Sequence, residues 1–496
     1  MKLSPRKTKI VATIGPASES PAMLERLLRA GMDVARLNFS HGDFDGHAEH
    51  IRRLRAAAQA TGCRVAILAD LPGPKMRLGK IEPEPILLAA GDSFVLTREP
   101  LVGDARRAST SFPRLPEVVK PGDRVSLNDG IVLLEVERVV GGEVSCRVVV
   151  GGELRSKKGL NLPGIDLGIS AFTERDRECL EHALRCGVDA VSQSFVESAA
   201  DIEAVRAAAA ALGAQPFVIA KIERAGAVRN IAEILRAADG IMVARGDLGV
   251  EVPIEEMAIL QKRLIAQALE LGKPVITATQ MLESMTASRL PTRAEATDVA
   301  NAILDGTDAI MLSAESAMGR FPEEAVAMLA RIAAYTEAHR PMVPRREAPP
   351  MDAPGTPARA AQAIGSVVEQ ALRTVPCSAV FVPTRTGATA RSIARYRVAP
   401  WIVALCREQG IARNLQFSYG VLPIEVEGRS DTTSASARAR SFCREHGLAG
   451  EVAMLVDGPS PSDPSANHRI EFLRLDQTTS PGSVPSVSAS KPGTAP

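Results

Sequence analysis

The sequence is short of residues that mark several classes of protein. Aromatic residues make up only 3% of the 496 residues, with a single tryptophan. Proteins usually hold single-stranded nucleic acid by stacking its bases on aromatic rings, and few such rings are available here. Lysine and arginine total 59, against 58 aspartate and glutamate residues. A chain so balanced has no strong field toward nucleic acid or acidic membranes, so we expect a small-molecule partner, no nucleic acid and no membrane.

Cysteine pairs and long apolar runs are missing as well. The seven cysteines are scattered and never form a Cys-x-x-Cys pair, which favours a reducing, cytoplasmic location. No stretch reaches the roughly 18 uncharged apolar residues that a membrane-spanning helix needs. The N-terminus is basic, but the apolar run that follows it at residues 10–15 is far too short for a signal peptide.

The chain does contain a repeated alternation of short β-rich runs with longer segments of helical period. This alternation is typical of parallel strands buried on both faces. One such helical segment, residues 255–271, is closed by Gly272 as a C-cap. Its apolar face is expected to consist of Ile259, Leu260, Leu264, Ala268 and Leu271. Eight strand–helix units predict an α/β fold, a closed (β/α)₈ TIM barrel. The expected strands are 9–13, 34–37, 65–69, 190–193, 217–220, 240–244, 274–277 and 309–312.

Between the third and fourth strands the helical period disappears. Turn signals separate short alternating runs over residues 73–156, which predicts a small β domain inserted in a barrel loop. The barrel itself is then expected to comprise residues 1–72 and 157–340.

A proline-rich linker at 341–357 leads into a third region. Residues 358–475 predict a C-terminal α/β regulatory domain that binds an effector. Its expected strands lie near residues 379–382, 401–405, 421–424 and 452–456. The final residues, 476–496, are rich in Ser and Pro without apolar period and are expected to be disordered.

Polar residues collect where the predicted barrel strands end. In such barrels the chemistry sits at the carboxyl ends of the strands, where the loops are free to vary. The residues delivered to this rim are Arg36, Asn38, Ser40, His41, Asp70, Lys221, Glu223, Arg245, Asp247, Thr277, Thr279, Gln280, Ser313 and Glu315. Each has an ordinary alternative, such as a salt bridge for Lys221 and Glu223 or a turn at Asp247. Their coincidence at one rim favours a functional site.

The residue types suggest a chemistry. Two carboxylates without His or Cys neighbours suit a hard divalent cation, Mg²⁺ with Mn²⁺ as an alternative, which takes its other ligands from water and substrate phosphate. Lysine and arginine close by would neutralise the oxygens of a phosphoryl group. No Gly-x-x-x-x-Gly-Lys-Ser/Thr loop occurs, so the phosphate is not handled by a P-loop. The residues alone predict Mg²⁺-assisted phosphoryl or enolate chemistry on a small anion.

Four motifs resemble those of the pyruvate kinase family. They are TKIVATIGPAS at 8–18, RLNFSHG at 36–42, GDLG at 246–249, and ATQMLES at 278–284 followed by PTRAE at 291–295. The likeness runs from about residue 6 to about residue 456. It implies transfer of a phosphoryl group from phosphoenolpyruvate to ADP, giving pyruvate and ATP, by a homotetramer.

The resemblance also implies roles for individual residues. Glu223 and Asp247 would hold the Mg²⁺, Lys221 would stabilise the phosphoryl group in transit, and Arg36 would bind it from the other side. Thr279 would lie on the face where the enolate is protonated, either by this residue or through water. The remaining implied contacts are Ser194, Gly246 and Asp247 for substrate, with backbone amides around Gly246 receiving its carboxylate, and Arg77, Lys158 and His41 for the nucleotide phosphates.

One motif departs from the commonest family pattern. Many members read DTKGPEIRT where this chain has DLPGPKMRL at 70–78, so Lys75 stands at a glutamate position. Lysine there marks the K⁺-independent branch of the family. A tethered ammonium can replace a free monovalent cation because both put one positive charge in the same pocket. The residues that match the K⁺ site, Asn38, Ser40 and Asp70, would then orient Lys75 and Arg36.

The C-terminal region carries FVPTRTGATA at 381–390, a strand that runs into a loop rich in hydroxyl groups and glycine. Thr384, Thr386, Gly387 and Thr389 could cradle a phosphate, and the equivalent family loop often binds a sugar-phosphate activator. The alternative is a well-capped turn. For the whole protein, the rivals are a dikinase-type transferase, which needs a phosphohistidine domain not visible here, and a metabolite sensor with an inactive barrel.

Overall fold

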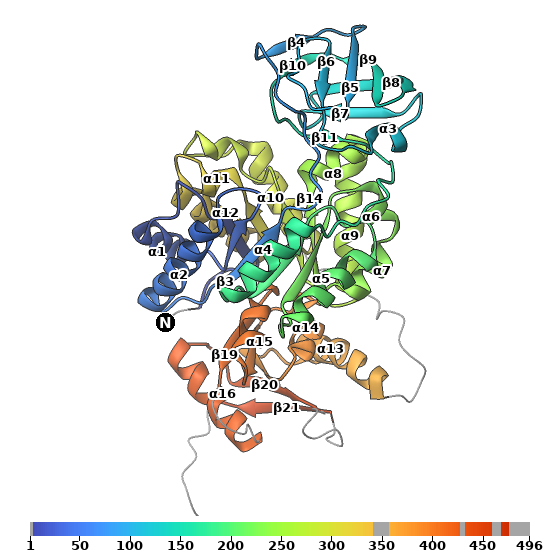
Figure 1. The fold of residues 1–496 in the computed structure, drawn as a ribbon. Helices are drawn as coiled ribbons and strands as arrows, with labels where there is room; N and C mark the ends of the chain where they lie inside the picture. Colours follow the sequence, from blue (N-terminus) through green and yellow to red (C-terminus); the bar gives the residue numbers. More distant parts are fainter. Residues whose placement is uncertain (1–2, 341–356, 427–431, 459–467, 476–496) are drawn as a thin grey trace, which may run out of the picture.

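The computed structural model describes residues 3–340, 357–426, 432–458 and 468–475 (Figure 1). Eight parallel strands close into a barrel in the order β1-β16-β15-β14-β13-β12-β3-β2. The strands are β1 (Lys9–Thr13), β2 (Val34–Asn38), β3 (Ala66–Leu71), β12 (Ala190–Gln193), β13 (Phe217–Ile222), β14 (Gly240–Ala244), β15 (Val275–Ala278) and β16 (Ala309–Leu312). The predicted (β/α)₈ barrel is confirmed.

The barrel strands are buried on both faces because their side chains alternate between two apolar layers. In β1, Ile10 and Ala12 belong to the core between barrel and helices, whereas Val11 belongs to a second core inside the barrel. Both layers select apolar residues, so these strands are nearly continuous hydrophobic runs. Phe417, from the C-terminal region, closes the inner core at the barrel floor by stacking on Phe217, with ring centroids 5.4 Å apart.

Helices cover the barrel from outside. They include α1 (Pro21–Ala30), α2 (Phe44–Thr61), α4 (Glu174–Arg185), α5 (Ala199–Ala211), α7 (Ile231–Ala237), α9 (Met257–Glu270), α10 (Arg293–Asp305) and α12 (Pro322–Ala338). The predicted apolar face of residues 255–271 was partly wrong. Leu260, Leu264 and Ala268 are buried, but Ile259 is 68% exposed and Leu271 49% exposed. Ile259 directly precedes Leu260 and therefore points about 100° away from it around the helix.

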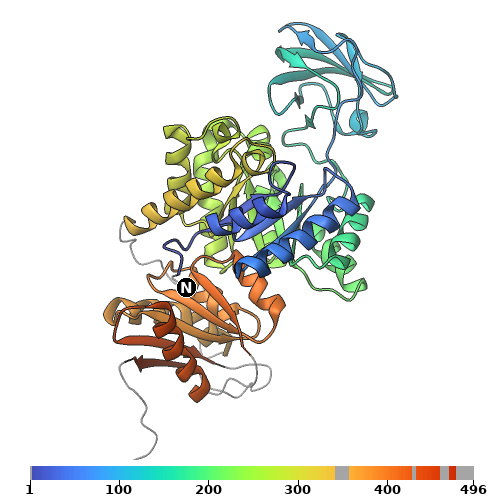
Figure 2. The same ribbon diagram turned by 90° about the vertical axis from the view of Figure 1, so that its left-hand side faces the viewer.

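An inserted domain stands on top of the barrel (Figures 1 and 2). Its six-stranded sheet has the order β11-β7-β8-β9-β5-β6, with β10 and β4 as a separate pair, and Phe94, Leu96 and Leu134 lie in its own core. Its elements are β4 (Ile86–Leu88), β5 (Ser93–Thr97), β6 (Arg107–Ser109), α3 (Leu115–Val118), β7 (Arg124–Leu127), β8 (Val132–Val140), β9 (Glu143–Val150), β10 (Gly152–Leu154) and β11 (Leu160–Asn161). We call residues 72–78 its outgoing segment and residues 157–165 its returning segment.

The C-terminal α/β domain has a five-stranded sheet in the order β19-β18-β17-β20-β21. Its elements are α13 (Pro357–Thr374), β17 (Ala379–Thr384), α14 (Ala388–Ala394), β18 (Trp401–Cys406), α15 (Gln409–Asn414), η3 (Leu415–Phe417), β19 (Val421–Glu425), α16 (Thr432–His446), β20 (Val452–Asp457) and β21 (Arg469–Arg474). Four strands were predicted; the antiparallel edge strand β21 was missed because Ser and Pro dominate the residues before it. Most of the predicted linker and the whole 476–496 tail lie outside the described residues.

The C-terminal domain sits below the barrel floor, opposite the inserted domain (Figure 1). Asp308, just before β16, forms an ion pair of 2.8 Å with Arg397 and accepts the Tyr419 N–H at 2.9 Å. Lys9 donates to the Val421 carbonyl at 2.8 Å, and burial lowers the pKa of Lys9 to about 8. The contact between the two domains is therefore organised around buried charges.

We predict that Arg397→Met destabilises the C-terminal half of the protein. Asp308 would lose its buried cation, and breaking such a pair costs about 3–5 kcal/mol. Denaturant unfolding followed by the fluorescence of Trp401, the only tryptophan, measures the change. The matched control is Arg175→Met, which removes an exposed pair with Glu178 and should cost at most about 1 kcal/mol. Equal losses in both variants would contradict the prediction.

Candidate active site

Lys221 lies near the carboxyl end of β13 and is almost completely buried. Its ammonium nitrogen is 2.7 Å from Ser194 Oγ, 2.8 Å from Glu223 Oε1 and 3.4 Å from Asp70 Oδ2. By itself burial lowers the pKa of Lys221, but the charges of Asp70 and Glu223 outweigh it and leave the pKa raised. Lys221 is therefore held as a cation at the rim.

Arg36 reaches the same cluster from β2. Its Nε donates to Asp70 Oδ2 at 3.0 Å, and its Nη1 donates to Thr13 Oγ1 at 2.9 Å. Asp70 also accepts the Ser192 hydroxyl at 2.6 Å. Burial raises the pKa of Asp70, but Lys221 and Arg36 lower it more strongly, so the net shift is downward. One carboxylate thus orients two cations that enter from different strands.

Glu223 is 1% exposed and lies one residue beyond β13. Its second oxygen accepts the Phe195 N–H at 2.7 Å. Burial raises the pKa of Glu223, Lys221 opposes the shift, and the nearby charge of Asp247 reinforces it, leaving the pKa raised. A buried and a half-buried carboxylate that repel each other are a fitting pair of ligands for a divalent cation. Within the described residues no group of three or more His, Cys, Asp or Glu side chains could hold a metal.

Asp247 and Gly246 lie in α8 (Arg245–Glu251), which starts directly after β14. The Gly246 N–H donates to Thr279 Oγ1 at 2.8 Å, and this hydroxyl donates to the Ala278 carbonyl at 2.6 Å. Thr279 has a φ of 67°, a conformation that a β-branched residue rarely adopts. Such strain persists where the surroundings over-determine it, often at functional sites.

Arg245 and Glu315 are among the predicted rim residues that do not join the cluster. The Arg245 guanidinium turns to Asp298, at 2.7 Å, and to the Thr279 carbonyl. Glu315 is buried and accepts the backbone N–H groups of Leu282 and Ser313. Both hold loops in place, which is why their charge alone did not reveal their role.

The predicted nucleotide contacts lie on the two segments that carry the inserted domain. The Leu78 N–H donates to the Lys158 carbonyl at 2.9 Å, so Arg77 and Lys158 stand on paired segments. His41 is exposed on the β2 side. Burial and the charges of Arg77, Lys75 and Arg36 lower the pKa of His41. His41 therefore lies close enough to Arg77, Lys75 and Arg36 for their charges to act on its ring.

The predicted substitute for K⁺ is not bonded to its expected partners in this structure. Lys75 is exposed, and no hydrogen bond or ion pair joins it to Asn38, Ser40 or Asp70 among the described residues. The Asn38 amide oxygen accepts the Ser40 N–H at 3.1 Å instead. Lys75 nevertheless lies close enough to lower the pKa of His41.

In the C-terminal loop, the predicted phosphate ligands bond to the loop itself. Thr384 Oγ1 accepts the Gly387 N–H at 2.9 Å, and Thr386 Oγ1 accepts the Ala388 N–H at 3.3 Å. Gly387 has a φ of 78°, which suits glycine at this helix start. No hydrogen bond of the Thr389 side chain is among those found in the described residues. This pattern favours the capped turn.

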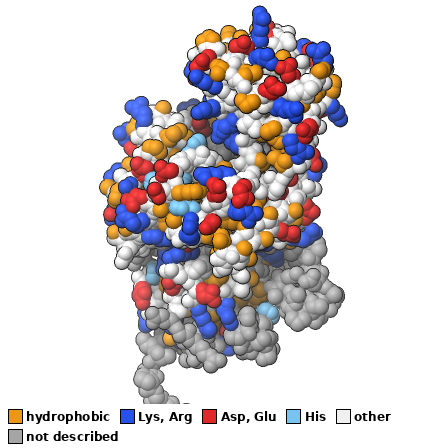
Figure 3. All heavy atoms as spheres, viewed as in Figure 1, with side chains coloured by type: hydrophobic (Ala, Val, Ile, Leu, Met, Phe, Trp, Pro, Cys, Tyr) orange, Lys and Arg blue, Asp and Glu red, His pale blue; other side chains and the backbone are white. Residues whose placement is uncertain are grey.

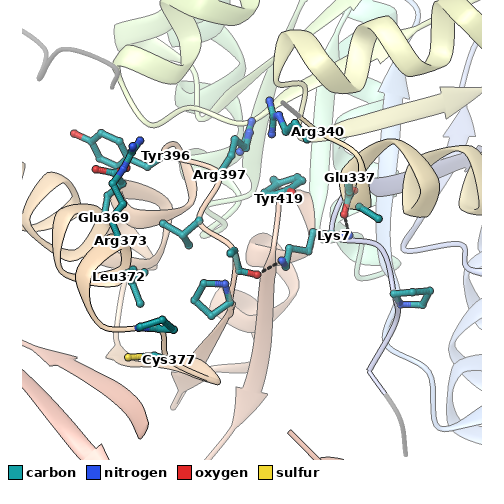
Figure 4. Close-up of a pocket in the computed structure, with 16 residues that line it drawn as sticks. Lys7, Glu337, Arg340, Glu369, Leu372, Arg373, Cys377, Tyr396, Arg397 and Tyr419 are labelled. Carbon is teal, nitrogen blue, oxygen red and sulfur yellow. Dashed lines mark hydrogen bonds and ion pairs between the residues drawn. The ribbon is translucent and has the colours of Figure 1, made fainter. Parts of the chain in front are cut away.

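A cavity of about 580 Å³ lies far from this rim, between α12, the N-terminal segment and the C-terminal domain (Figure 4). Among the cations that line it, Lys7 donates to the Ala399 carbonyl and Arg373 pairs with Glu369, whereas Nε and Nη1 of Arg340 are buried without a hydrogen-bond partner within the described residues. The cavity belongs to the contact between domains. No helix in the described part of the chain is long and apolar enough to cross a membrane. On the face in Figure 3, cationic and anionic side chains are intermixed.

Reasoning from sequence missed three groups that position the cluster. Thr13 and Ser192 hold Arg36 and Asp70, and the Phe195 amide holds Glu223. Thr13 and Ser192 lie at strand ends, which was the available signal. Phe195 offered none, since the group it uses is a backbone amide at a φ of 58°.

Fixed cations beside carboxylates suit phosphoryl transfer, which is the chemistry of a phosphotransferase. Family models agree: "Pyruvate kinase, barrel domain" matches residues 5–326, and "Pyruvate kinase, alpha/beta domain" matches residues 362–462. The chain belongs to the pyruvate kinase family.

Individual relatives agree with this assignment. A pyruvate kinase of Thermococcus litoralis is 49% identical over 85% of this chain and 89% of its own length. One of Mycobacterium intracellulare is 40% identical over 95% and 99%. The crystal structure of a pyruvate kinase from Cryptosporidium parvum superposes with a TM-score of 0.85 at 32% identity, covering 95% of this chain and 96% of that one.

We predict that Asp70→Asn lowers stability in a pH-dependent way. Because the folded-state pKa of Asp70 is lowered, its contribution is complete above the ordinary aspartate pKa of about 4 and is lost as pH falls through the folded pKa. Near pH 7 the variant should lose about 3–5 kcal/mol. Thermal melts from about pH 7 down to about pH 2 test this, because the loss falls below the ordinary aspartate pKa, with exposed Asp45→Asn as control. A deficit that grows toward acid would contradict it.

Proposed function

We propose that this enzyme transfers the phosphoryl group of phosphoenolpyruvate to ADP, giving pyruvate and ATP, as the last step of glycolysis. The observation that carries the proposal is the buried Lys221 ammonium, held between Asp70, Ser194 and Glu223 at the rim. A fixed cation in a place shielded from water stabilises charge that develops on a phosphoryl group and needs no reorganisation during transfer.

In this proposal Arg36 binds the phosphoryl group from the side opposite Lys221. Both cations are fixed by Asp70, so their spacing is set before substrate arrives. Preorganised charges are worth more than mobile ones because they do not have to be oriented during the reaction. Ser194 contributes by fixing Lys221 through its hydroxyl group.

Glu223 and Asp247 would hold Mg²⁺, or Mn²⁺ in its place. The fit rests on the nearby carboxylates of buried Glu223 and half-buried Asp247, whose mutual repulsion a divalent cation would relieve. When bound, the cation would supply positive charge to the substrate's carboxylate and phosphate oxygens. A substrate carboxylate at α8 would take over the Gly246 N–H from Thr279 Oγ1, which would free that hydroxyl on the face where the enolate receives its proton.

Arg77, Lys158 and His41 would contact the nucleotide phosphates. The first two are carried by the segments that join the inserted domain to the barrel, so movement of that domain would bring them toward the rim. With its pKa lowered, His41 is neutral near pH 7 and would act as a hydrogen-bonding group.

We further propose that Lys75 makes the enzyme independent of K⁺, by adding its charge beside Arg36 when the inserted domain closes. Asn38, Ser40 and Asp70 would then orient these cations. A sugar phosphate remains a candidate effector for the Thr384–Thr389 loop, where it would have to displace the hydroxyl caps. A cytoplasmic homotetramer completes the proposal.

Lys221→Met tests the central role. The side chain keeps its length but loses its charge, so kcat should fall at least about a hundredfold. A coupled assay of pyruvate formation measures it, and a thermal melt checks folding. The control is Lys262→Met on α9, whose lysine is half exposed and pairs with Asp305. A variant with near wild-type kcat would contradict the role, and a wild type that binds phosphoenolpyruvate without turnover would favour a sensor.

Activity in K⁺-free and Na⁺-free buffer tests the role of Lys75. Addition of K⁺ should change the wild-type rate by less than about twofold, whereas Lys75→Glu should become strongly K⁺-dependent because it replaces the tethered cation by an anion. Lys80→Glu, an exposed change in the same domain, should behave like wild type. A large K⁺ stimulation of the wild type would overturn the idea.

A further inference from the structure

The returning segment of the inserted domain is held by a group of buried charges that the reaction does not use. Arg224 lies directly after Glu223, and its side chain is 6% exposed. Its Nη2 donates to the Ile165 carbonyl at 2.6 Å, and its Nη1 is 2.9 Å from Glu197 Oε1. One guanidinium therefore connects the inserted domain with the barrel rim.

A second carboxylate links this group to the other candidate metal ligand. Glu251, at the end of α8, lies 4.0 Å from Arg224 Nε, and one of its oxygens accepts the Gly164 N–H at 3.4 Å. The same helix carries Asp247 in its first turn. The returning segment is thus bonded to Arg224, which directly follows candidate metal ligand Glu223, and to Glu251, which shares α8 with candidate metal ligand Asp247.

The outgoing segment is tied down differently. The Gly73 N–H donates to Asp176 Oδ1 at 2.8 Å, and Ser194 Oγ donates to the Leu71 carbonyl at 2.6 Å. Gly73 has a φ of 66° and packs so closely on Phe195 that an added Cβ would lie 2.9 Å from its ring. This anchor is a pivot in which the side chains of Asp176, Ser194 and Phe195 hold the backbone from Leu71 to Gly73.

The charge balance makes Arg224 the decisive member of the group. Asp166, Glu197 and Glu251 all bring negative charge to this place. Burial and the charges of Glu251 and Asp166 raise the pKa of Glu197, and burial with the charge of Asp247 raises the pKa of Glu251. Among the described residues the nearby opposing cations are Arg224 and the more exposed Arg229. Without Arg224 the carboxylates would repel, and the Ile165 carbonyl would lose its donor.

We propose that Arg224 is a positioning residue that sets the position of the returning segment, and with it Lys158 and Arg77, relative to Glu223 and Asp247. This inference rests on the function proposed above, because it assigns nucleotide contacts to the inserted domain. Arg224 touches no reacting atom and acts through the segment it holds. Nucleotide use should therefore depend on it more than binding of phosphoenolpyruvate.

Arg224→Gln tests the inference. The KM for ADP should rise about tenfold and kcat should fall, because a small displacement of contact groups is costly. The dissociation constant for phosphoenolpyruvate, measured calorimetrically with Mg²⁺, should change less than about twofold, because the rim cluster does not include Arg224. Arg224→Lys should recover part of the loss, since an ammonium can still bond Ile165 or Glu197. Arg236→Gln, an exposed change on α7 away from these carboxylates, should match wild type.

Hydrogen exchange on the substrate-free protein provides a readout independent of catalysis. The amides around 164–165 should exchange faster in Arg224→Gln, and Glu197→Gln should show a weaker form of the same effect. If the wild type is active, an unchanged KM for ADP in Arg224→Gln would overturn the positioning role. Equal losses of ADP and phosphoenolpyruvate binding in this variant would overturn it too. A wild type without phosphoryl transfer would instead refute the proposed function and leave the exchange result standing.

Discussion

The active rim depends on one buried carboxylate, Asp70, which holds Lys221 and Arg36 at the same time. Two cations brought together without such a partner would repel each other and would be costly to bury. Asp70 is in turn bonded by Ser192 from the adjacent strand. The geometry of the cluster therefore follows from the register of β2, β3, β12 and β13, which places these residues side by side.

Residues beside the rim also attach the inserted domain to the barrel. Ser194 and Phe195, just after β12, contact Lys221 and Glu223 on one side and the pivot glycine Gly73 on the other. Arg224 and Glu251 lie beside the site in the same way and bond to the backbone of the returning segment. The inserted domain is thus attached to the barrel through residues that also shape the site. At the floor, the ion pair of Arg397 with Asp308 and the stacking of Phe417 on Phe217 fix the C-terminal domain to the opposite end.

The pattern of apolar and polar residues predicted the structure correctly wherever a single strand or helix decides which residues are buried. The eight barrel strands were predictable because strands buried on both faces must be apolar throughout. Arg36, Asp70, Lys221 and Glu223 were predictable as a group because parallel strands end at a common rim. Pattern failed at Ile259, where an apolar residue lies outside the buried stripe, and at β21, whose alternating run follows residues dominated by Ser and Pro.

The sequence by itself determined the barrel, its inserted and C-terminal domains, the family and the residues that end each strand. Only the tertiary structure decided where each charge points. Arg245 and Glu315 stand at strand ends like Lys221 and Glu223, yet Arg245 turns to Asp298 on α10 and Glu315 to the Leu282 backbone, and both partners come from other elements. A buried charged side chain points toward the nearest group that can form a hydrogen bond or ion pair with it. The sequence does not show which group that is.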